Sequence, residues 1–277
     1  MEGLTLAKQT CADFVSLIYK YDIICLIETW TTKTSQIEIT GYKTLVHSYR
    51  KFVNKRAKRA SGGLIIYVKN SIYKGVKLVK NEIDCIIWFK LEKEFFNLEE
   101  DIYIGAAYIV PENSAVHAVY DVDFFLKLEE DISFFANKGK VLLMGDLNSR
   151  TGTKNDFINT SQDRTDSYLF SNETPSTRVS MDRTVNRFGD MLLDLCKASG
   201  MCIVNGRFIG DENNGSYTCM TANGESVVDY LLTSFSNFKM ISDFKVHAFN
   251  EHSNHTPLSF SIRANCHEVR EATQNWK

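Results

Sequence analysis

Apolar residues recur at helical spacing in three stretches of the chain, at residues 7–18, 122–135 and 188–196. Side chains three or four positions apart share one face of a helix, so this period predicts three amphipathic helices that cover a core. The apolar positions that define them are Ala7, Cys11, Phe14, Val15 and Ile18; then Val122, Phe125, Leu126, Ile132 and Phe135; then Phe188, Met191, Leu192, Leu195 and Cys196.

Short apolar runs rich in isoleucine, valine and aromatic residues lie between and after these helices. Runs of this length and composition predict buried strands. Many strands with about three helices predict an α/β (α+β) domain in which helices cover two packed sheets. The predicted strands are Ile23–Ile27, Leu64–Val68, Cys85–Leu91, Ile102–Tyr108, Lys140–Met144, Met201–Val204, Ser216–Cys219, Val227–Leu232, Ile241–His247 and Leu258–Ile262.

The chain of 277 residues has only 3 prolines, and no Gly/Ser-rich stretch divides it into two halves. Its hydrophobic content of 44% is enough to bury a large core. We therefore expect one domain over residues 1–263 and a polar tail over 264–277. Residues 151–186 are polar and weakly periodic, and this is long for a loop without structure, so we expect them to be functional or mobile.

The net charge of -2 argues against a surface that attracts nucleic acid everywhere. One segment is strongly basic, however, and a local cluster can meet a phosphate backbone. A solvated loop that only keeps the protein soluble is the alternative interpretation. The basic residues of this segment are Arg50, Lys51, Lys55, Arg56, Lys58 and Arg59.

The 7 cysteines are odd in number and form no C-x-x-C pair. Cys25, Cys85 and Cys219 lie in apolar runs, which predicts buried free thiols in a reducing compartment. The N-terminus lacks the layout of a signal peptide, and no apolar run approaches the roughly 20 residues of a membrane helix. We expect an intracellular protein, nuclear or cytoplasmic, that is neither secreted nor in a membrane.

Polar residues with chemical potential fall at the ends of predicted strands. Asp146 and Asn148 follow one strand, Glu28 ends another, and His255 precedes a third. An Asp-x-Asn sequence is often only a turn, because both side chains bond their own backbone. Asp229 lies inside an apolar run, so its carboxylate needs a partner if it is buried. A histidine suits this role, although the chain offers 6 of them.

Phosphodiester hydrolysis would use such a set of residues. It needs a hard cation on the phosphate, a group that positions or deprotonates water, and donors for the developing charge. Glu251, His252 and His255 form a second, weaker candidate for a metal cluster. The residues that would serve phosphodiester hydrolysis are Glu28, Tyr108, Asp146, Asn148, Asp229 and His255.

Six short motifs follow one another along the chain: Ile27-Glu28-Thr29, Ser61-Gly62-Gly63, Tyr108, Gly145-Asp146-Leu147-Asn148, Ser226-Val227-Val228-Asp229-Tyr230 and Ser253-Asn254-His255. In this order and spacing they resemble the endonuclease/exonuclease/phosphatase superfamily. Within it, the chain is most similar to the apurinic-type endonuclease domain of non-LTR (LINE-type) retrotransposons. The resemblance spans roughly residues 1–263.

The resemblance implies a DNase I-like, four-layer sandwich of two β-sheets flanked by helices. It also implies a monomer that nicks DNA with Mg²⁺, or Mn²⁺ as the alternative cation. A reverse transcriptase would accompany the domain in a full-length element, although no such sequence follows Ile262. The resemblance gives Glu28 a role in metal binding, Asp146 in orienting or deprotonating water, Asn148 and Tyr108 in contacting the phosphate, and Asp229 in pairing with His255.

Two departures from the family pattern affect these expectations. The family opens with a strand and an asparagine that have no counterpart ahead of Met1; Glu2 matches the acidic metal-binding position, and we expect that the chain starts at an internal methionine. The family also has an aspartate where this chain has Asn254, which we expect to weaken metal binding or catalysis. A catalytically impaired remnant, or a phosphatase or ribonuclease of the same superfamily, therefore remains an alternative.

Overall fold

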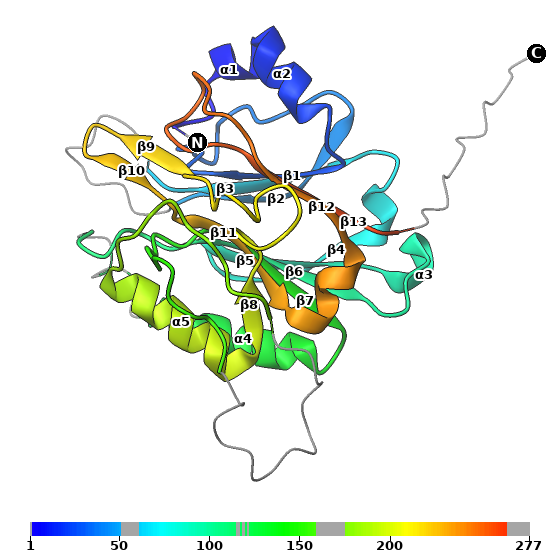
Figure 1. Cartoon of the computed structure of the whole chain (residues 1–277). Coiled ribbons are helices and arrows are strands. Elements are labelled where there is room, and N and C mark those ends of the chain that lie inside the picture. The colour runs from blue at the N-terminus through cyan, green and yellow to red at the C-terminus, as the bar shows by residue number, and fades with distance from the viewer. Residues whose placement is uncertain are drawn as a thin grey trace, which may run out of the picture.

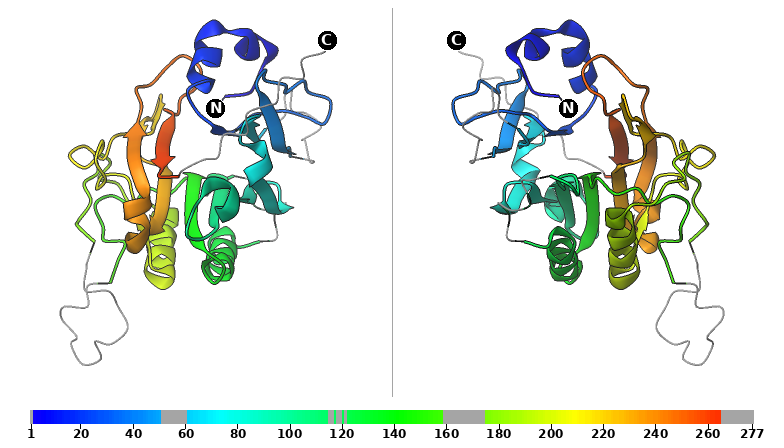
Figure 2. Two further views of the ribbon diagram at one scale, coloured as in Figure 1. Left: turned by 90° about the vertical axis from the view of Figure 1, so that its right-hand side faces the viewer. Right: turned by 90° about the vertical axis from the view of Figure 1, so that its left-hand side faces the viewer.

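The computed structural model describes residues 2–50, 61–114, 117, 120, 122–158 and 175–264. Two β layers lie between two layers of helices (Figures 1 and 2). Two short helices cover one outer face, and two longer helices cover the other (Figure 1). The helices are α1 (Leu6–Thr10), α2 (Ala12–Ile18), α3 (Lys93–Phe96), α4 (Phe124–Ala136) and α5 (Arg187–Ser199), with 3-10 turns η1 (Tyr73–Gly75) and η4 (Phe235–Met240).

One β layer is a continuous sheet of six strands, which packs against α4 and α5. Within it β6 and β7 are parallel, and the other neighbouring pairs are antiparallel. In spatial order the strands are β4 (Val76–Ile83), β5 (Ile86–Leu91), β6 (Ile102–Tyr108), β7 (Lys140–Asp146), β11 (Asp229–Ser234) and β8 (Met201–Ile203).

The second β layer is divided into two pieces, both of which pack on the same face of the six-stranded sheet. One piece has the order β1-β3-β2, and the other pairs β12 with β13. A separate hairpin, β9–β10, lies beside these pieces (Figure 1). The strands are β1 (Ile23–Ile27), β2 (Tyr42–Ser48), β3 (Leu64–Lys69), β9 (Cys219–Thr221), β10 (Gly224–Ser226), β12 (Ile241–Val246) and β13 (Leu258–Ile262).

The alternation of side chains along the strands explains the layers. Ile66 of β3 and Ile87 of β5 face the core between the two β layers. Their neighbours face outwards, Ile65 towards α2 and Trp88 towards α4 and α5. Because successive residues of a strand point to opposite faces, one apolar run can serve two cores. This confirms the predicted helices over two packed sheets.

Several predicted boundaries were wrong for local physical reasons. The first predicted helix is two helices, because Cys11 between them has extended backbone angles and the Thr10 hydroxyl bonds backward to Leu6 and Ala7. The pattern also missed β2 and β4. Exposed lysines interrupt the apolar residues of both, and β4 is an edge strand on which charged side chains are common.

A cavity of about 540 Å³ lies between the two pieces of the divided layer. β1 and β13 both line it, and within the described part of the chain each has a ladder partner on one side alone. Gly3 and Leu4 donate backbone hydrogen bonds to Glu28 and Thr29, just beyond the end of β1. The layer is therefore held by backbone pairing within each piece but not along the boundary between them.

All six cysteines that the structure describes are free thiols, as predicted. Cys85 and Cys219 are buried, whereas Cys25 is half-buried. None of the helices in the described ranges combines the length and apolar character needed to cross a bilayer. Residues 265–277 of the predicted tail, and 159–174 of the predicted irregular segment, lie outside the described residues.

Candidate active site

Three neighbouring strands of the six-stranded sheet place Tyr108, Asp146 and Asp229 side by side. Tyr108 is opposite Asp146 in the parallel β6–β7 pair, and Asp229 is opposite Asp146 in the antiparallel β7–β11 pair. Gly145 permits this close alignment, because a Cβ at that position would lie 1.9 Å from the carbonyl oxygen of Ala107. The sheet register therefore fixes a tyrosine and two carboxylates at one edge.

His255 reaches this edge from the loop between β12 and β13. It forms an isolated bridge with Cys219 of β9, and its neighbours Asn254 and Thr256 also make backbone hydrogen bonds to the β9 segment. Its Nδ1 atom lies 2.8 Å from Oδ2 of Asp229. Ligand atoms of Asp146, Asp229 and His255 all lie within 4.8 Å of one another. This is the acid–histidine pairing that the sequence left open.

The electrostatics of this cluster reflect burial of negative charge. Asp146 is only 4% exposed, and burial together with the neighbouring charge of Asp229 raises its pKa to about 7. Burial opposes the charged form of His255, but the hydrogen bond and charge of Asp229 outweigh it and raise the histidine pKa to about 11. Burial, followed by the charge of Glu28, raises the pKa of the Tyr108 hydroxyl. A cation would relieve the repulsion between the two carboxylates.

Asn148 is part of a tight turn with Asp146. Its backbone N–H donates to Asp146 Oδ1 at 2.9 Å, as the simple turn interpretation requires. Its side-chain amide donates to Ile109 O at 2.8 Å, and its φ of 47° is in the left-handed region that asparagine tolerates. The turn thus holds the Asp146 carboxylate in place and directs Asn148 to the same edge.

Glu28 lies just after β1, also in the left-handed region with φ 60°. Trp30 Nε1 and the backbone N–H of Gly62 donate to its Oε2 atom. The Glu28 carboxylate lies beside the Tyr108 hydroxyl and raises its pKa. Glu28 stands outside the compact group of Asp146, Asp229 and His255.

Glu2 and Asn254 form a separate contact near the His255 loop. Asn254 Nδ2 donates to Glu2 Oε1 at 2.8 Å, and Lys8 Nζ donates to the backbone carbonyls of Glu2 and His252. The amide at position 254 therefore binds the acidic side chain that the sequence marked as a metal ligand. An aspartate there would instead place two carboxylates together.

Arg50 is the one member of the basic segment within the described residues. Its Nη1 donates to Ser61 Oγ at 2.7 Å, and its charge lowers the Tyr108 pKa against the larger effect of burial. A cationic side chain therefore lies on the same side of the molecule as the carboxylate cluster. The remaining predicted contacts, Lys51, Lys55, Arg56, Lys58 and Arg59, lie outside the described residues.

Several residues that support the site were not assigned a role from the sequence. Thr218 Oγ1 accepts the backbone N–H groups of Val228 and Asp229, each at 3.0 Å. The amide of Asn205 bridges Asp229 O and the backbone N–H of Leu231. A polar residue directly after an apolar strand was the available signal for Asn205, but its partner depends on tertiary pairing.

A partly buried ion pair supports the strand that carries Asp229. Arg150 makes a two-fold contact with Asp182, with nitrogen–oxygen distances of 2.8 and 2.7 Å. Asp182 is 3% exposed and also accepts the backbone N–H of Val227. Burial raises the pKa of Asp182, but the hydrogen bonds from Arg150 and from the backbone N–H groups of Thr184 and Val227 outweigh burial and lower the pKa. The pair ties the polar segment before α5 to the start of β11.

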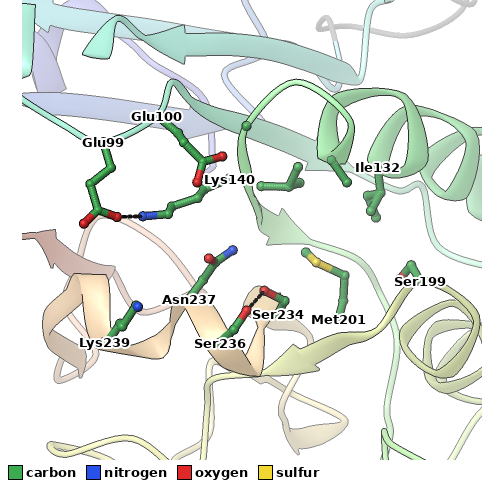
Figure 3. A pocket seen from close by; sticks show the side chains of 13 residues that line it. Glu99, Glu100, Ile132, Lys140, Ser199, Met201, Ser234, Ser236, Asn237 and Lys239 are labelled. Carbon is green, nitrogen blue, oxygen red and sulfur yellow. Dashed lines mark hydrogen bonds and ion pairs between the residues drawn. The ribbon is translucent and has the colours of Figure 1, made fainter. Parts of the chain in front are cut away.

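A polar groove of about 380 Å³ lies at the opposite end of the six-stranded sheet (Figure 3). Lys140 lies at its rim at the start of β7, whereas Asp146 ends the same strand. Lys140 pairs with Glu99 at 3.2 Å, and the hydroxyls of Ser234 and Ser236 are 3.0 Å apart. The groove is lined by none of the residues predicted for the chemistry, which lie at the other edge.

The donor set at that edge fits a hard divalent cation. Asp146 and Asp229 offer carboxylate oxygens at adjacent register positions, and Glu28 offers a third beyond Tyr108. Oxygen ligands of this kind are preferred by magnesium and manganese. His255 already uses Nδ1 on Asp229, which leaves Nε2 for another partner.

Comparisons with known proteins agree with this fold. Three solved structures are similar: the AP endonuclease LMAP from Leishmania major (17% identity, TM-score 0.68, 95% of this chain and 85% of that chain), the 3′ phosphatase NExo from Neisseria bound to product DNA hairpin (16%, 0.59, 95% and 96%), and the endonuclease domain of TRAS1, a telomere-specific non-LTR retrotransposon (14%, 0.57, 95% and 95%).

The search of curated proteins found no match. A family model, described as the Endonuclease/Exonuclease/phosphatase family, matches residues 11–243. The four-layer, DNase I-like sandwich that the sequence predicted is confirmed. The chain belongs to the Endonuclease/Exonuclease/phosphatase family.

Proposed function

We propose that this protein is a Mg²⁺-dependent endonuclease that hydrolyses phosphodiester bonds in DNA, and that it derives from a non-LTR retroelement. The observation that carries the proposal is the alignment of Tyr108, Asp146 and Asp229 across three strands, with His255 bonded to Asp229. A hydroxyl, two carboxylates and an imidazole converge at one edge, which suits hydrolysis of a phosphate ester.

Each side chain takes a role that its surroundings support. Asp146, with its pKa near neutrality, orients or deprotonates the attacking water. The protonated form of His255, stabilised by Asp229, donates to the phosphate oxygens as charge develops. Tyr108 stays protonated and donates to the phosphate or the leaving oxygen, because burial and Glu28 raise its pKa.

The remaining roles concern the phosphate and the cation. Asn148 binds the phosphate, while Glu28 and Asp146 provide oxygen ligands for the cation and Glu2 contributes from the rim. When bound, Mg²⁺ or Mn²⁺ supplies positive charge against the phosphate and its leaving oxygen. Arg50, beside Ser61, extends the positive surface towards a DNA backbone.

The decisive experiment is nicking of a supercoiled plasmid by the purified 277-residue chain with Mg²⁺ and with EDTA. Nicking should require the cation and should disappear in Asp146→Asn, which keeps the shape of the side chain. Glu130→Gln, on the exposed face of α4, is the matched control and should nick at the wild-type rate. Equal nicking by wild type and Asp146→Asn would overturn the proposal.

Substrate choice separates this function from a phosphatase or ribonuclease of the same family. The plasmid assay is run beside a 3′-phosphate oligonucleotide, a single-stranded RNA and a soluble inositol polyphosphate. Cleavage of one of these without plasmid nicking would mean that the same site hydrolyses a substrate other than DNA. The alternative, a catalytically impaired remnant, is motivated by Asn254, whose side-chain amide donates a hydrogen bond to the carboxylate of Glu2.

A further inference from the structure

A second group of metal-ligand side chains lies outside the site described above. It consists of Cys11, Glu251 and His252, whose thiol, carboxylate and imidazole ligand atoms lie within 4.8 Å of one another. Cys11 joins α1 to α2, and the other two belong to the loop between β12 and β13. In Figure 1 this orange loop lies against the two blue helices. The fold thus brings ligands from opposite ends of the described chain within reach of one ion.

The sequence had grouped Glu251 and His252 with His255, and the structure separates them. His255 bonds to Asp229, whereas His252 turns towards α2 and makes an edge-on contact with Phe14, with ring centroids 5.4 Å apart. The backbone N–H of His252 donates to Asn250 Oδ1 at 2.9 Å. The loop therefore presents His252 and His255 to two different ligand groups.

The local structure holds this second group in place. Lys8 Nζ donates to the His252 carbonyl at 2.6 Å, which fastens the loop to α1. Cys11 has extended backbone angles between the two helices, and its side chain is half-buried, as is that of His252. Glu251 is exposed, so an ion can reach the group from solvent. The Lys8 charge opposes a bound cation, but a Cys11 thiolate and the Glu251 carboxylate outweigh it.

We propose that Cys11, Glu251 and His252 bind a transition-metal cation of the zinc class, at a site distinct from the Asp146 cluster. A thiolate and an imidazole favour zinc over the hard cations that carboxylate oxygens bind. Three protein ligands leave the fourth position of a tetrahedral ion to water.

The bound ion joins the α1–α2 junction to the loop that carries His255. His252 and His255 are three residues apart, so the ion limits how far His255 moves from Asp229. This consequence rests on the proposed function, whereas ion binding itself does not. The site acts as a structural clamp, and the Asp146 cluster keeps the hard cation.

Cobalt titration of the full 277-residue chain tests the ligand set directly, because Co²⁺ bound to a thiolate has an intense near-ultraviolet charge-transfer absorption. The wild type should develop this band, and Cys11→Ser should lose it. Cys219→Ser is the matched control, since Cys219 contacts His255 at the other site, and it should retain the band. Excess Mg²⁺ should leave the band unchanged. No band in the wild type, or an unchanged band in Cys11→Ser, would overturn the proposal.

Thermal melting gives a second readout that does not depend on nicking. Zn²⁺ should raise the Tm of the wild type and of Cys219→Ser, and should leave that of Cys11→Ser unchanged. Melting in metal-free buffer establishes that each variant folds. If Cys11→Ser is unfolded there, His252→Gln and Glu251→Gln take its place and should both reduce the Zn²⁺ shift. A full Zn²⁺ shift in these variants would contradict the ligand set, whatever the outcome of the plasmid assay.

Discussion

The two β layers of this molecule are held together in different ways. The six-stranded sheet is one continuous hydrogen-bonded ladder, and every residue of its strand β6 is buried. In the other layer, side chains join the two pieces across their boundary: Tyr21 OH lies 3.1 Å from His247 Nε2, which lies 2.7 Å from Ser259 Oγ. Backbone ladders fix register over many residues, whereas single side-chain contacts fix one point each.

The proposed site takes residues from both layers. Tyr108, Asp146 and Asp229 belong to the continuous sheet, so the ladder sets their spacing. Glu28 follows β1, and His255 lies in the loop before β13, so both depend on the divided layer. We infer that changes in the divided layer move these two groups without unfolding the sheet that carries the other three.

The largest expected effect concerns the contact that crosses the two layers. Asp229→Asn and His255→Gln should each lower Mg²⁺-dependent cleavage by about 10²–10⁴-fold, since each removes one half of an acid–histidine pair. The double variant should be no slower than the slower single variant, because residues that act as a unit are not additive. Single-turnover cleavage rates of the four proteins provide the measurement.

Multiplication of the two single effects in the double variant would show that Asp229 and His255 act separately. Circular dichroism of each variant controls for folding. The comparison is sharpened if both variants melt within a few degrees of wild type, because the contact between the layers would then serve chemistry more than stability.

A smaller effect on stability should distinguish the two layers. Asp131 of α4 is buried and binds Lys80 at 2.6 Å and Trp88 Nε1 at 2.9 Å, which fastens the helix to the continuous sheet. Asp131→Ala should lower the free energy of unfolding by about 3 kcal/mol, because it leaves the buried Trp88 N–H without its acceptor and removes the nearer carboxylate from Lys80. Tyr21→Phe, across the divided layer, should cost about 1 kcal/mol.

Urea unfolding of both variants, with Glu130→Gln as the surface control, measures this difference. A loss in Tyr21→Phe as large as that in Asp131→Ala would show that the divided layer depends on this one contact. The two-layer contrast would then fail.

The sequence predicted the two β layers about equally well, and one strand of each was missed, β4 in the continuous sheet and β2 in the divided layer. β1, β6 and β13 were predicted at both boundaries; β1 is the plainest case, because the charged residues Asp22 and Glu28 flank its apolar run. The strand β2 was missed since its exposed Lys43 breaks the apolar pattern, and its pairing with β3 only becomes favourable in the folded protein.

In the candidate site, local sequence patterns identify some residues, and tertiary contacts place the others. Asp146 and Asp229 could be singled out locally, as a turn motif and as a charge in an apolar run. The choice of His255 among the histidines, and the contact of Asn254 with Glu2, require a loop position that no local pattern encodes. Cys11 gave no sign of a metal group, since its neighbours in space are distant in sequence.

The pH dependence of the metal-free protein gives the next prediction. Asp146 has a folded-state pKa raised from 3.8 to about 7, so its ionised form is disfavoured in the folded state. Its contribution to stability is therefore lost as pH rises from about 4 to 7. The His255 pKa is raised from 6.5 to about 11, so its contribution is present below pH 6.5 and is lost as pH rises towards 11.

Asp146→Asn removes the first contribution and reduces the second only in part, because the Asp146 charge is the smallest of the causes that raise the His255 pKa. Its Tm minus that of wild type should therefore be smallest near pH 4 and should increase up to about pH 7, by about 2–4 °C for each kcal/mol recovered. Melting in EDTA across this range provides the measurement, and Mg²⁺ should reduce the difference. A Tm difference between Asp146→Asn and wild type that does not vary with pH would show that ionisation of Asp146 costs the folded protein no stability.

The smallest expected effect comes from Asn254 at the rim of the divided layer. Asn254→Asp replaces a donor to Glu2, 2.8 Å away, with a second carboxylate. In EDTA the repulsion should lower the Tm slightly. The pair is exposed, so the loss in free energy of unfolding should be less than about 1 kcal/mol. With Mg²⁺ the two carboxylates share the cation, so the Tm should rise more than that of wild type and cleavage should increase a few-fold. Asn254→Ala, which removes the donor without adding charge, should show neither response to Mg²⁺. If Asn254→Asp and Asn254→Ala respond alike, the rim plays no part in cation binding, and the cation is held by Glu28 and the carboxylates of the continuous sheet.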